Sequence, residues 1–159
     1  MKIEIDDLTR PAVHALLREH MRSMHALGPP ESVHALDLAG LRRPEITFWT
    51  AWSGDLLLGC GALLALSATH GEVKSMRTDA AFQGRGVGAQ ILTYIIEQCR
   101  IRGYRRLSLE TGSSDHFAAA HRLYRRFGFT PCGPFANYPD DPFSRFYTLD
   151  LGVVVGPTR

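Results

Sequence analysis

The feature that most constrains the fold is a cluster of glycines between a strand pattern and a helix pattern. Gly84, Gly86 and Gly88 lie within five positions. The preceding stretch, 71–78, alternates in polarity as a strand does, and apolar residues recur at helical spacing over 87–99. Glycine lets a ligand approach the backbone closely, and the first N–H groups of a helix have no partner within it. The junction therefore predicts either an anion-binding turn or, more simply, a tight turn.

The rest of the chain reads as one α/β domain. Strands are expected at 2–6, 46–52, 56–66, 71–78, 105–111 and 144–151, with a short extra strand before the last, and helices at 11–27, 33–41, 87–102 and 115–127. Thr9 is expected to cap the first helix. Strands without a helix between them pair antiparallel, whereas a strand–helix–strand unit predicts one parallel pair. We expect a domain at 1–151 and a tail at 152–159.

Composition excludes several classes of protein. The net charge is +2 and no basic run is dense, so we expect no nucleic-acid partner. The N-terminus lacks an apolar signal segment and no apolar run approaches ~20 residues, so we expect a cytoplasmic protein without membrane association. The three cysteines form no CxxC pair and the histidines no HExxH motif, which predicts free thiols and no metal. The last strand and the apolar stretch 153–155 suggest a homodimer.

The glycines also fit a second pattern, that of dinucleotide-binding folds. "GRGVGA" at 84–89 matches GxGxxG/A, and an acidic residue, Glu110, follows at the end of the next strand. In a dinucleotide fold, however, a strand buried on both faces runs straight into the first glycine. Here the strand alternates in polarity and "DAAFQ" at 79–83 intervenes. A nicotinamide-dependent oxidoreductase is therefore the less favoured reading.

A third pattern resembles a known family. "QGRGVG" at 83–88 fits Q/R-x-x-G-x-G/A and looks like the acyl-CoA signature of the GNAT acetyltransferases. "LYRRFGF" at 123–129 and the order of elements match that family over most of the chain. The segments "PPESVHALD", "GCGAL", "KSMRT", "SLETG" and "CGPFANYPDDPFS" resemble a subgroup of small bacterial GNATs, some labelled as acetyltransferases of indole-acetate type.

The resemblance implies a fold, an activity and a co-substrate. The fold is a single-domain GNAT fold: a mixed, mostly antiparallel sheet flanked by helices, with a splayed central parallel strand pair. The activity is acetyl transfer from acetyl-CoA, with no metal. By alignment, the co-substrate contacts fall on Met76, Arg77, Thr78, Gln83, Gly84, Arg85, Gly86, Val87, Gly88 and Ala89. Many GNATs have Asn at the position of Phe117, which puts one contact in doubt; Ser113 or Ser114 could substitute for it.

Three residues are candidates for proton transfer. Tyr124 matches the Tyr of the family's "LY" motif, and a phenol with a pKa near 10 holds a proton to donate at neutral pH. Glu72 and Glu110 are candidate bases, because a carboxylate in an apolar cleft can have its pKa raised toward neutrality. A packed aromatic and surface carboxylates are the structural alternatives. His34, His116 and a chain of waters are further candidates for the base.

The acceptor pocket is expected from two segments rich in proline. Within 29–37 and 133–145, the candidates for contacting a small polar acceptor are Glu31, Ser32, His34, Tyr138 and Arg145. Arg77 or Arg145 facing this pocket would favour a carboxylate on the acceptor, whereas the acidic loop residues favour a cationic amine. The sequence therefore predicts acetyl transfer to a small molecule, at an amine, by direct attack in a ternary complex. A non-catalytic acyl-CoA sensor and a protein or peptide N-acetyltransferase are the alternatives.

Overall fold

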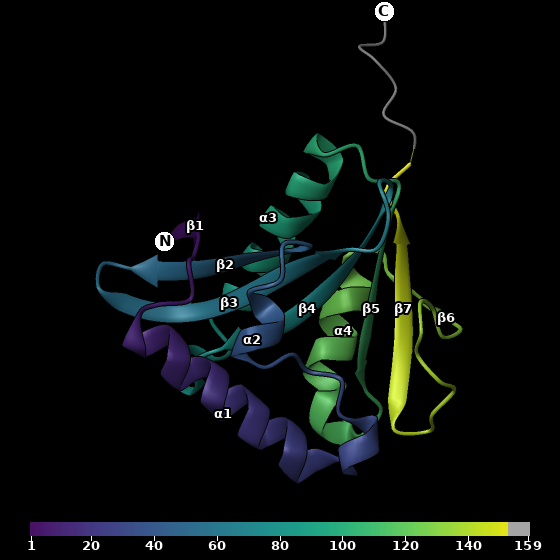
Figure 1. Ribbon diagram of the computed structural model, residues 1–159, viewed down its shortest axis with the longest axis horizontal. Helices are drawn as coiled ribbons and strands as arrows, with labels where there is room; N and C mark the ends of the chain where they lie inside the picture. The colour runs from purple at the N-terminus through teal and green to yellow at the C-terminus, as the bar shows by residue number, and fades with distance from the viewer. Residues whose placement is uncertain (153–159) are drawn as a thin grey trace, which may run out of the picture.

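The computed structural model describes residues 1–152, which form one seven-stranded sheet with helices on both faces (Figure 1). The apolar stretch 153–155, and with it the suggestion of a dimer, lies outside the described residues. The strands are β1 (Lys2–Ile5), β2 (Ile46–Ser53), β3 (Leu56–Ala65), β4 (His70–Thr78), β5 (Arg106–Gly112), β6 (Thr130–Cys132) and β7 (Ser144–Asp150). The helices are α1 (Pro11–Leu27), α2 (Leu38–Leu41), α3 (Val87–Ile101) and α4 (Ala118–Arg126), with 3-10 turns η1 (Pro30–Ser32), η2 (Ala80–Phe82) and η3 (Asp115–Phe117).

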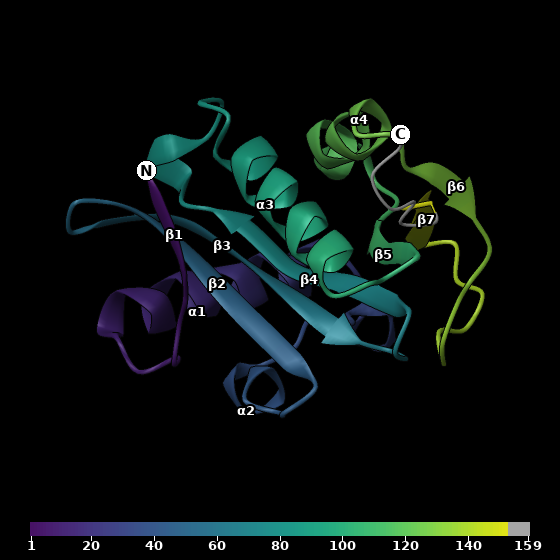
Figure 2. The same cartoon turned by 90° about the horizontal axis from the view of Figure 1, so that it is seen from above.

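The sheet has the order β1-β2-β3-β4-β5-β7-β6. Every neighbouring pair is antiparallel except β4 and β5, which α3 connects in parallel. α1 and α2 cover one face of the sheet and α3 and α4 the other, as the view from above shows (Figure 2). The mixed α/β fold predicted from the sequence is confirmed, including the single parallel pair and the short strand before the last.

The parallel pair separates along its length. β4 and β5 pair only from His70↔Arg106 to Val73↔Leu109, although both strands continue. Beyond this point β4 stays with β3 as far as Thr78, and β5 stays with β7. The register of β3 with β4 shifts at Ser75, whose φ of 55° lies in the left-handed region. A bulge of this kind bends its strand, so the carboxyl ends of β4 and β5 diverge and leave a gap at the centre of the sheet.

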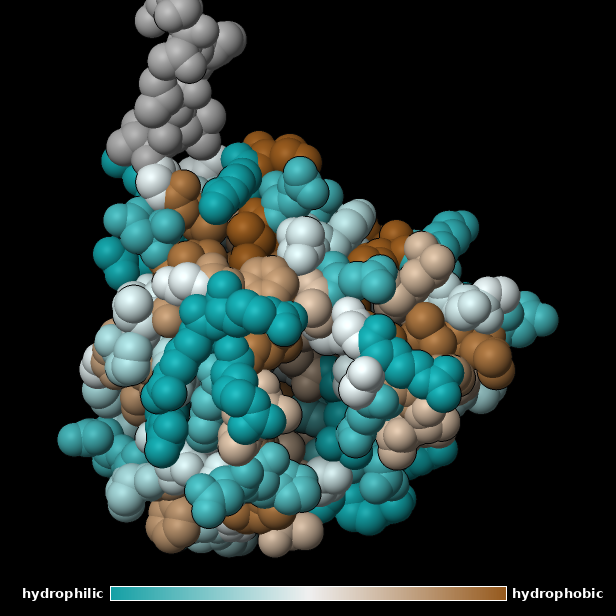
Figure 3. Space-filling view, turned by 180° about the vertical axis from the view of Figure 1, so that it is seen from behind, coloured by the Kyte–Doolittle hydropathy of each residue, from teal (hydrophilic) through white to brown (hydrophobic). Residues whose placement is uncertain are grey.

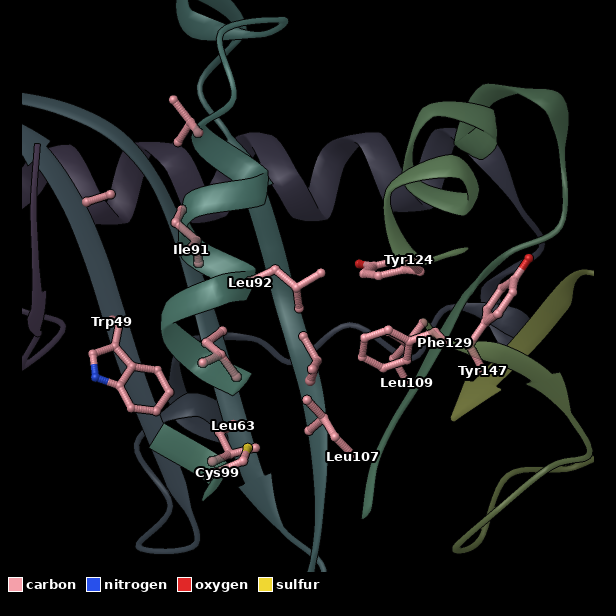
Figure 4. Close-up of a cluster of buried hydrophobic side chains, with 14 of the residues drawn as sticks. Trp49, Leu63, Ile91, Leu92, Cys99, Leu107, Leu109, Tyr124, Phe129 and Tyr147 are labelled. Carbon is pink, nitrogen blue, oxygen red and sulfur yellow. The ribbon is translucent and has the colours of Figure 1, made fainter. Parts of the chain in front are cut away.

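Two hydrophobic cores hold the layers together. The larger lies between the sheet and α3 with α4, and its fully buried side chains include Trp49, Leu63, Ile91, Leu92, Cys99, Leu107 and Leu109 (Figure 4). The second lies under α1 and is built from Val13, Leu16 and Leu17 against the opposite face of the sheet. The apolar periodicity of α1 and α3 places one face of each helix against the sheet. The two cores fix the helices on either side of the gap.

Two local predictions were wrong. Thr9 does not cap α1: its hydroxyl donates to Asp7, Arg10 occupies the N-cap, and Pro11 begins the helix. The helix expected at 33–41 is only the single turn α2, because the Asp37 side chain accepts a hydrogen bond from Gly40 and starts the helix at residue 38. The preceding segment is therefore extended and free to reach the gap in the sheet.

The cysteines are free thiols, as predicted. Cys60 and Cys99 are fully buried, and burial raises the pKa of the Cys60 thiol to about 12 and that of Cys99 to about 11. Thiols held in the protonated form are poor nucleophiles. Within residues 1–152, no helix has the length and apolar character required to cross a membrane, and no group of His, Cys, Asp and Glu side chains is arranged to hold a metal.

Candidate active site

The gap between β4 and β5 opens into a cleft of about 1000 Å³, which we call the central cleft. Its walls come from α1, the segment after α1, β4, the glycine loop, β5 and α4. Seen from the side of α3 and α4, the surface is hollowed between two lobes (Figure 3). Both faces of the sheet therefore contribute to one cleft, because the divergence of two strands makes an opening through the sheet.

The glycine loop closes one end of the central cleft. Gly84 and Gly86 have φ angles of 76° and 82°, which residues with a side chain rarely adopt, and Gly86 is the N-cap of α3. A Cβ at either position would meet nothing within 4 Å, so the loop leaves open space beside the first N–H groups of the helix. No acidic residue in the first turn offsets the positive end of the helix dipole. The loop can therefore accept an anionic group such as a pyrophosphate.

Eight of the ten residues expected to contact the co-substrate line the central cleft: Met76, Arg77, Thr78, Gln83, Gly84, Gly86, Gly88 and Ala89. The other two do not. Val87 is buried in the larger core, so only its backbone is available. The guanidinium of Arg85 lies 5.7 Å from the centre of the Phe82 ring, outside the lining. The backbone of β4 beyond Val73 has no strand partner on the side of β5.

A buried charged group occupies the α1 side of the central cleft. Lys74 Nζ donates to Glu72 Oε2 at 3.1 Å and to Tyr138 Oη at 2.8 Å. The Tyr138 hydroxyl in turn donates to the same Glu72 oxygen. The side chains of Glu72 and Lys74 are only 3% and 9% exposed. Burial, and then the charge of Glu72, raise the pKa of Tyr138, so its hydroxyl stays protonated. Glu72 is therefore engaged by two donors.

Glu110 is the second carboxyl group in the central cleft. It lies on β5 just past the last residue paired with β4, and accepts a hydrogen bond from Ser144 Oγ at 2.7 Å. Burial raises its pKa to about 7, against the opposing effects of the Ser144 hydrogen bond and the charge of Lys74. A carboxyl group with this pKa gains and loses a proton near neutral pH.

Tyr124 reaches the same gap from the opposite face of the sheet. It lies on α4, and its hydroxyl points from that helix toward Leu92 of α3 (Figure 4). Its side chain is buried and packs on Phe129 and Tyr147. Burial, and then the nearby Glu110, raise the pKa of Tyr124 to about 12. The hydroxyl therefore keeps its proton over the physiological range.

Two segments predicted to form the acceptor pocket meet over the α1 side of the central cleft. Ser32 Oγ donates to Asp141, and the ring of His34 packs edge-on against Tyr138 with 4.9 Å between centroids. Ser32, His34 and Tyr138 all line the cleft. Burial lowers the pKa of His34, and the charge of Lys74 lowers it further. This contact narrows access to the cleft from the α1 side.

Two predicted acceptor residues lie elsewhere. Glu31 is exposed and outside the lining of the central cleft. Arg145 is also exposed and does not line the cleft; one of its guanidinium nitrogens lies 3.3 Å from His121 Nδ1. Because neighbouring residues of a strand point to opposite faces, Ser144 directs its side chain to Glu110 while Arg145 turns away. The sequence alone did not reveal which residues of β7 point inward.

Four residues of the site were not among those predicted from the sequence. Lys74 holds Glu72 and Tyr138, Ser144 holds Glu110, and Asp141 holds Ser32. His20 of α1 also lines the central cleft. Only Lys74 had a usable signal, since it lies two residues from Glu72 on the same face of one strand. The other contacts join segments far apart in the sequence.

Phe117, which replaces the usual Asn, also lines the central cleft. Its ring packs directly over Gly112, where an added Cβ would lie 2.2 Å from the ring. Ser113, Ser114 and His116 line the cleft beside it. The turn η3 after β5 thus presents an aromatic side chain to the cleft at a position where many GNATs have an amide.

Comparisons with known proteins agree with this architecture. The family model described as "Acetyltransferase (GNAT) family" matches residues 12–129. The chain is 56% identical to the uncharacterized N-acetyltransferase YsnE of Bacillus subtilis, over 95% of this chain and 100% of the relative. It is 38% identical to the IAA acetyltransferase of Azospirillum brasilense, over 88% and 91%. A crystal structure from Klebsiella pneumoniae, assigned as an acyl-CoA N-acyltransferase, superposes with a TM-score of 0.76 at 26% identity, covering 95% and 97%.

The splayed sheet and the glycine loop at the start of α3 define an acyltransferase that works on acyl-CoA. The chain belongs to the GNAT acetyltransferase family, as the sequence resemblance predicted, and acetyl-CoA is its co-substrate. The residues present fit this co-substrate: the open glycine backbone would hold its pyrophosphate, and the β4 backbone beyond Val73, which is not paired with β5, would bind its pantetheine.

Proposed function

We propose that the protein transfers the acetyl group of acetyl-CoA to the amine of a small molecule, by direct attack within a ternary complex. The observation that carries this proposal is the position of Glu110 and Tyr124. Both line the central cleft where β4 and β5 separate, one on a strand of the sheet and the other on α4. A base on the acceptor side and an acid on the co-substrate side are what aminolysis of a thioester needs.

Glu110 is our candidate for the general base. An amine must lose a proton before or during attack, and a carboxylate with a pKa near 7 can take it at neutral pH. Glu72 is less suited, because Lys74 and Tyr138 already donate to its carboxylate. We assign Glu72 the role of holding Lys74 and Tyr138 in place. His34 is a poorer base, since its pKa is lowered.

Tyr124 is our candidate for the general acid. As the carbon–sulfur bond of the thioester breaks, the departing thiolate requires a proton, and Tyr124 holds one at neutral pH. Glu110 then releases the amine proton to solvent, and Tyr124 takes up a proton from solvent. The oxyanion that develops on the thioester carbonyl needs N–H donors, and the unpaired backbone of β4 beyond Val73 can supply them.

A small acceptor is favoured over a protein chain. The contacts from Ser32 to Asp141 and from His34 to Tyr138 close over the acceptor side of the central cleft. A peptide substrate would require an open groove on that side.

A cytoplasmic location and a homodimer remain predictions from the sequence, as does the lack of a nucleic-acid partner.

The first test is a thermal-shift titration with acetyl-CoA, CoA and NADH. A ligand that binds only the folded state raises the melting temperature as it saturates the protein. Acetyl-CoA should raise it and NADH should not, and Gly86→Trp should abolish the rise. Gly54→Trp is the matched control, because Gly54 also has a positive φ of 59° and open surroundings but lies in the β2–β3 turn.

The second test is a thiol-release assay with small amines and with peptides. Release of CoA with a small amine supports the proposal, whereas release with peptides alone would favour a protein acetyltransferase. Binding of acetyl-CoA without release on either panel would favour the non-catalytic sensor. No binding of acetyl-CoA to the folded protein would contradict the proposed function altogether.

A further inference from the structure

We propose that the acceptor carries a carboxylate, and that the guanidinium of Arg77 binds it. This inference rests on the proposed function, since it names the class of molecule that receives the acetyl group.

Arg77 points to the acceptor side of the sheet. The neighbouring β4 residues face α3: a Cβ added at Gly61 would touch Met76 Sδ together with side chains of α3, and Thr78 Oγ1 lies near Gly88. Arg77 instead donates from a terminal nitrogen to Ser23 Oγ of α1, at 3.3 Å. Its side chain is therefore on the face opposite the glycine loop, away from the place where that loop could hold a pyrophosphate.

Arg77 lacks a counter-charge within the described residues. No carboxylate of residues 1–152 lies within ion-pair distance of it, and its only side-chain hydrogen bond is to a neutral serine. Its Nε is buried without a hydrogen-bond partner in the described part of the chain. A buried donor left unpaired costs about 1–3 kcal/mol, and more when the group is charged. An incoming carboxylate would satisfy both needs, because its two oxygens match the fork of a guanidinium.

The other charged groups facing this part of the central cleft are already balanced or screened. Lys74 is paired with Glu72, and Asp141 accepts from Ser32 near the surface. His20 of α1 lies near Arg77; burial, and then the charge of Arg77, lower its pKa to about 4, so it is neutral. Arg77 therefore faces the acceptor side as a cation without an ion-pair partner in residues 1–152, and Glu110 is close to half ionised at neutral pH.

The shape of the cleft agrees with an acceptor that has an anionic end and an amine end. Met24 and Leu27 of α1 line it as an apolar wall, and Arg77 and Glu110 lie on the two strands that border the gap. A molecule with its carboxylate on Arg77 can direct its amine toward Glu110. Amino acids and ω-amino acids are the simplest members of this class.

The test compares acids with their amides. Thiol release is measured with leucine against leucinamide and with 6-aminohexanoate against 6-aminohexanamide, on wild type, Arg77→Gln and Arg145→Gln. Arg145 is the matched control, since it is an arginine outside the central cleft. Wild type should prefer at least one acid to its amide, and Arg77→Gln should reduce kcat/KM for that acid by roughly 10- to 100-fold, the loss of one charge-assisted hydrogen bond. The amide rates, and all rates of Arg145→Gln, should stay within about twofold.

Binding without turnover gives an independent readout. Hexanoate and hexanamide are titrated against CoA-loaded protein by thermal shift, and only hexanoate should raise the melting temperature, with the rise lost in Arg77→Gln. Equal shifts by acid and amide, or no shift by either, overturn the inference even if amines are acetylated. A rise in KM for acetyl-CoA in Arg77→Gln also overturns it, because Arg77 would then belong to the co-substrate. Failure of the proposed function appears separately, as acid binding without acetyl transfer to any amine.

Discussion

Replacing Ser144 with alanine tests the assignment of Glu110 through the pH dependence of the reaction. The Ser144 hydroxyl donates to the Glu110 carboxylate at 2.7 Å and so favours its ionised form. Hydrogen bonds to charged groups contribute roughly 1.5–3 kcal/mol, and the cleft is open to water, so the lower end applies. About 1.4 kcal/mol corresponds to one pKa unit. The pKa of Glu110, about 7 in the native protein, should therefore rise further in Ser144→Ala.

The sign of the effect follows from the form that reacts. A general base acts when deprotonated, so kcat/KM should rise with pH through the pKa of Glu110 and reach a plateau above it. In Ser144→Ala this rise should move up by about one pH unit, which lowers the rate at pH 7 roughly fivefold and leaves the plateau nearly unchanged. Glu110→Gln should remove the inflection and lower the plateau by roughly 10²-fold or more.

The assay is thiol release from pH 5.5 to 9.5 with one acceptor, with rates expressed per concentration of unprotonated amine so that the acceptor's own titration drops out. Ser53→Ala is the control, because Ser53 is exposed at the end of β2. An inflection that stays at the same pH in Ser144→Ala, or moves down, would refute Glu110 as the titrating base. An inflection that persists in Glu110→Gln would do the same.

Three further predictions concern the acid, the co-substrate wall and stability. Tyr124→Phe should lower kcat by roughly 10²-fold or more, whereas Tyr147→Phe, which removes a buried hydroxyl without a hydrogen-bond partner in residues 1–152, should leave kcat unchanged; equal losses in steady-state kinetics would contradict the role of Tyr124. Gly112→Ala should displace the ring of Phe117 into the central cleft and raise KM for acetyl-CoA, and an unchanged KM would place that ring outside the binding path. His20 has a folded pKa of about 4 against 6.5 when exposed, so the unfolded state binds more protons between these values and stability falls as pH drops through this window. That loss should be about 2 kcal/mol smaller in His20→Gln, as measured by urea unfolding at pH 7 and 4.5.

Much of the fold could be read from local patterns. The periodicity of 87–99 and the alternation of 71–78 predicted α3 and β4, and the absence of helices between 46 and 78 predicted the antiparallel pairs. Errors occurred where two local signals competed. Thr9 and Arg10 both precede the proline that starts α1, and hydrogen bonding of Thr9 to Asp7 decided between them. The helix expected at 33–41 failed because Asp37 caps a later start.

In the candidate site, too, local features could be predicted from the sequence and long-range contacts could not. The glycine loop was recognisable because its requirement is local: positive φ at Gly84 and Gly86 and an open helix N-terminus all lie within one short segment. The environment of Glu110 was not, because its pKa depends on burial and on Ser144, which lies 34 residues away. Tyr124 is an intermediate case: its motif could be recognised locally, whereas its burial depends on residues distant in the sequence.

The sequence by itself determined an α/β fold with a glycine loop before a helix, since turn chemistry and hydrophobic period are properties of neighbouring residues. Its resemblance to the GNAT family added the class of protein, an acetyltransferase that uses acyl-CoA. Only the tertiary structure decided which charged side chains share the cleft. In the structure Lys74 is paired with Glu72, Arg145 points away from the cleft, and Arg77 faces the acceptor side without a counter-charge among residues 1–152. The physical reason is that a strand residue can point to either face of the sheet. Which face borders the cleft depends on where β4 and β5 separate, and these strands are too far apart in the sequence for a local pattern to encode that point.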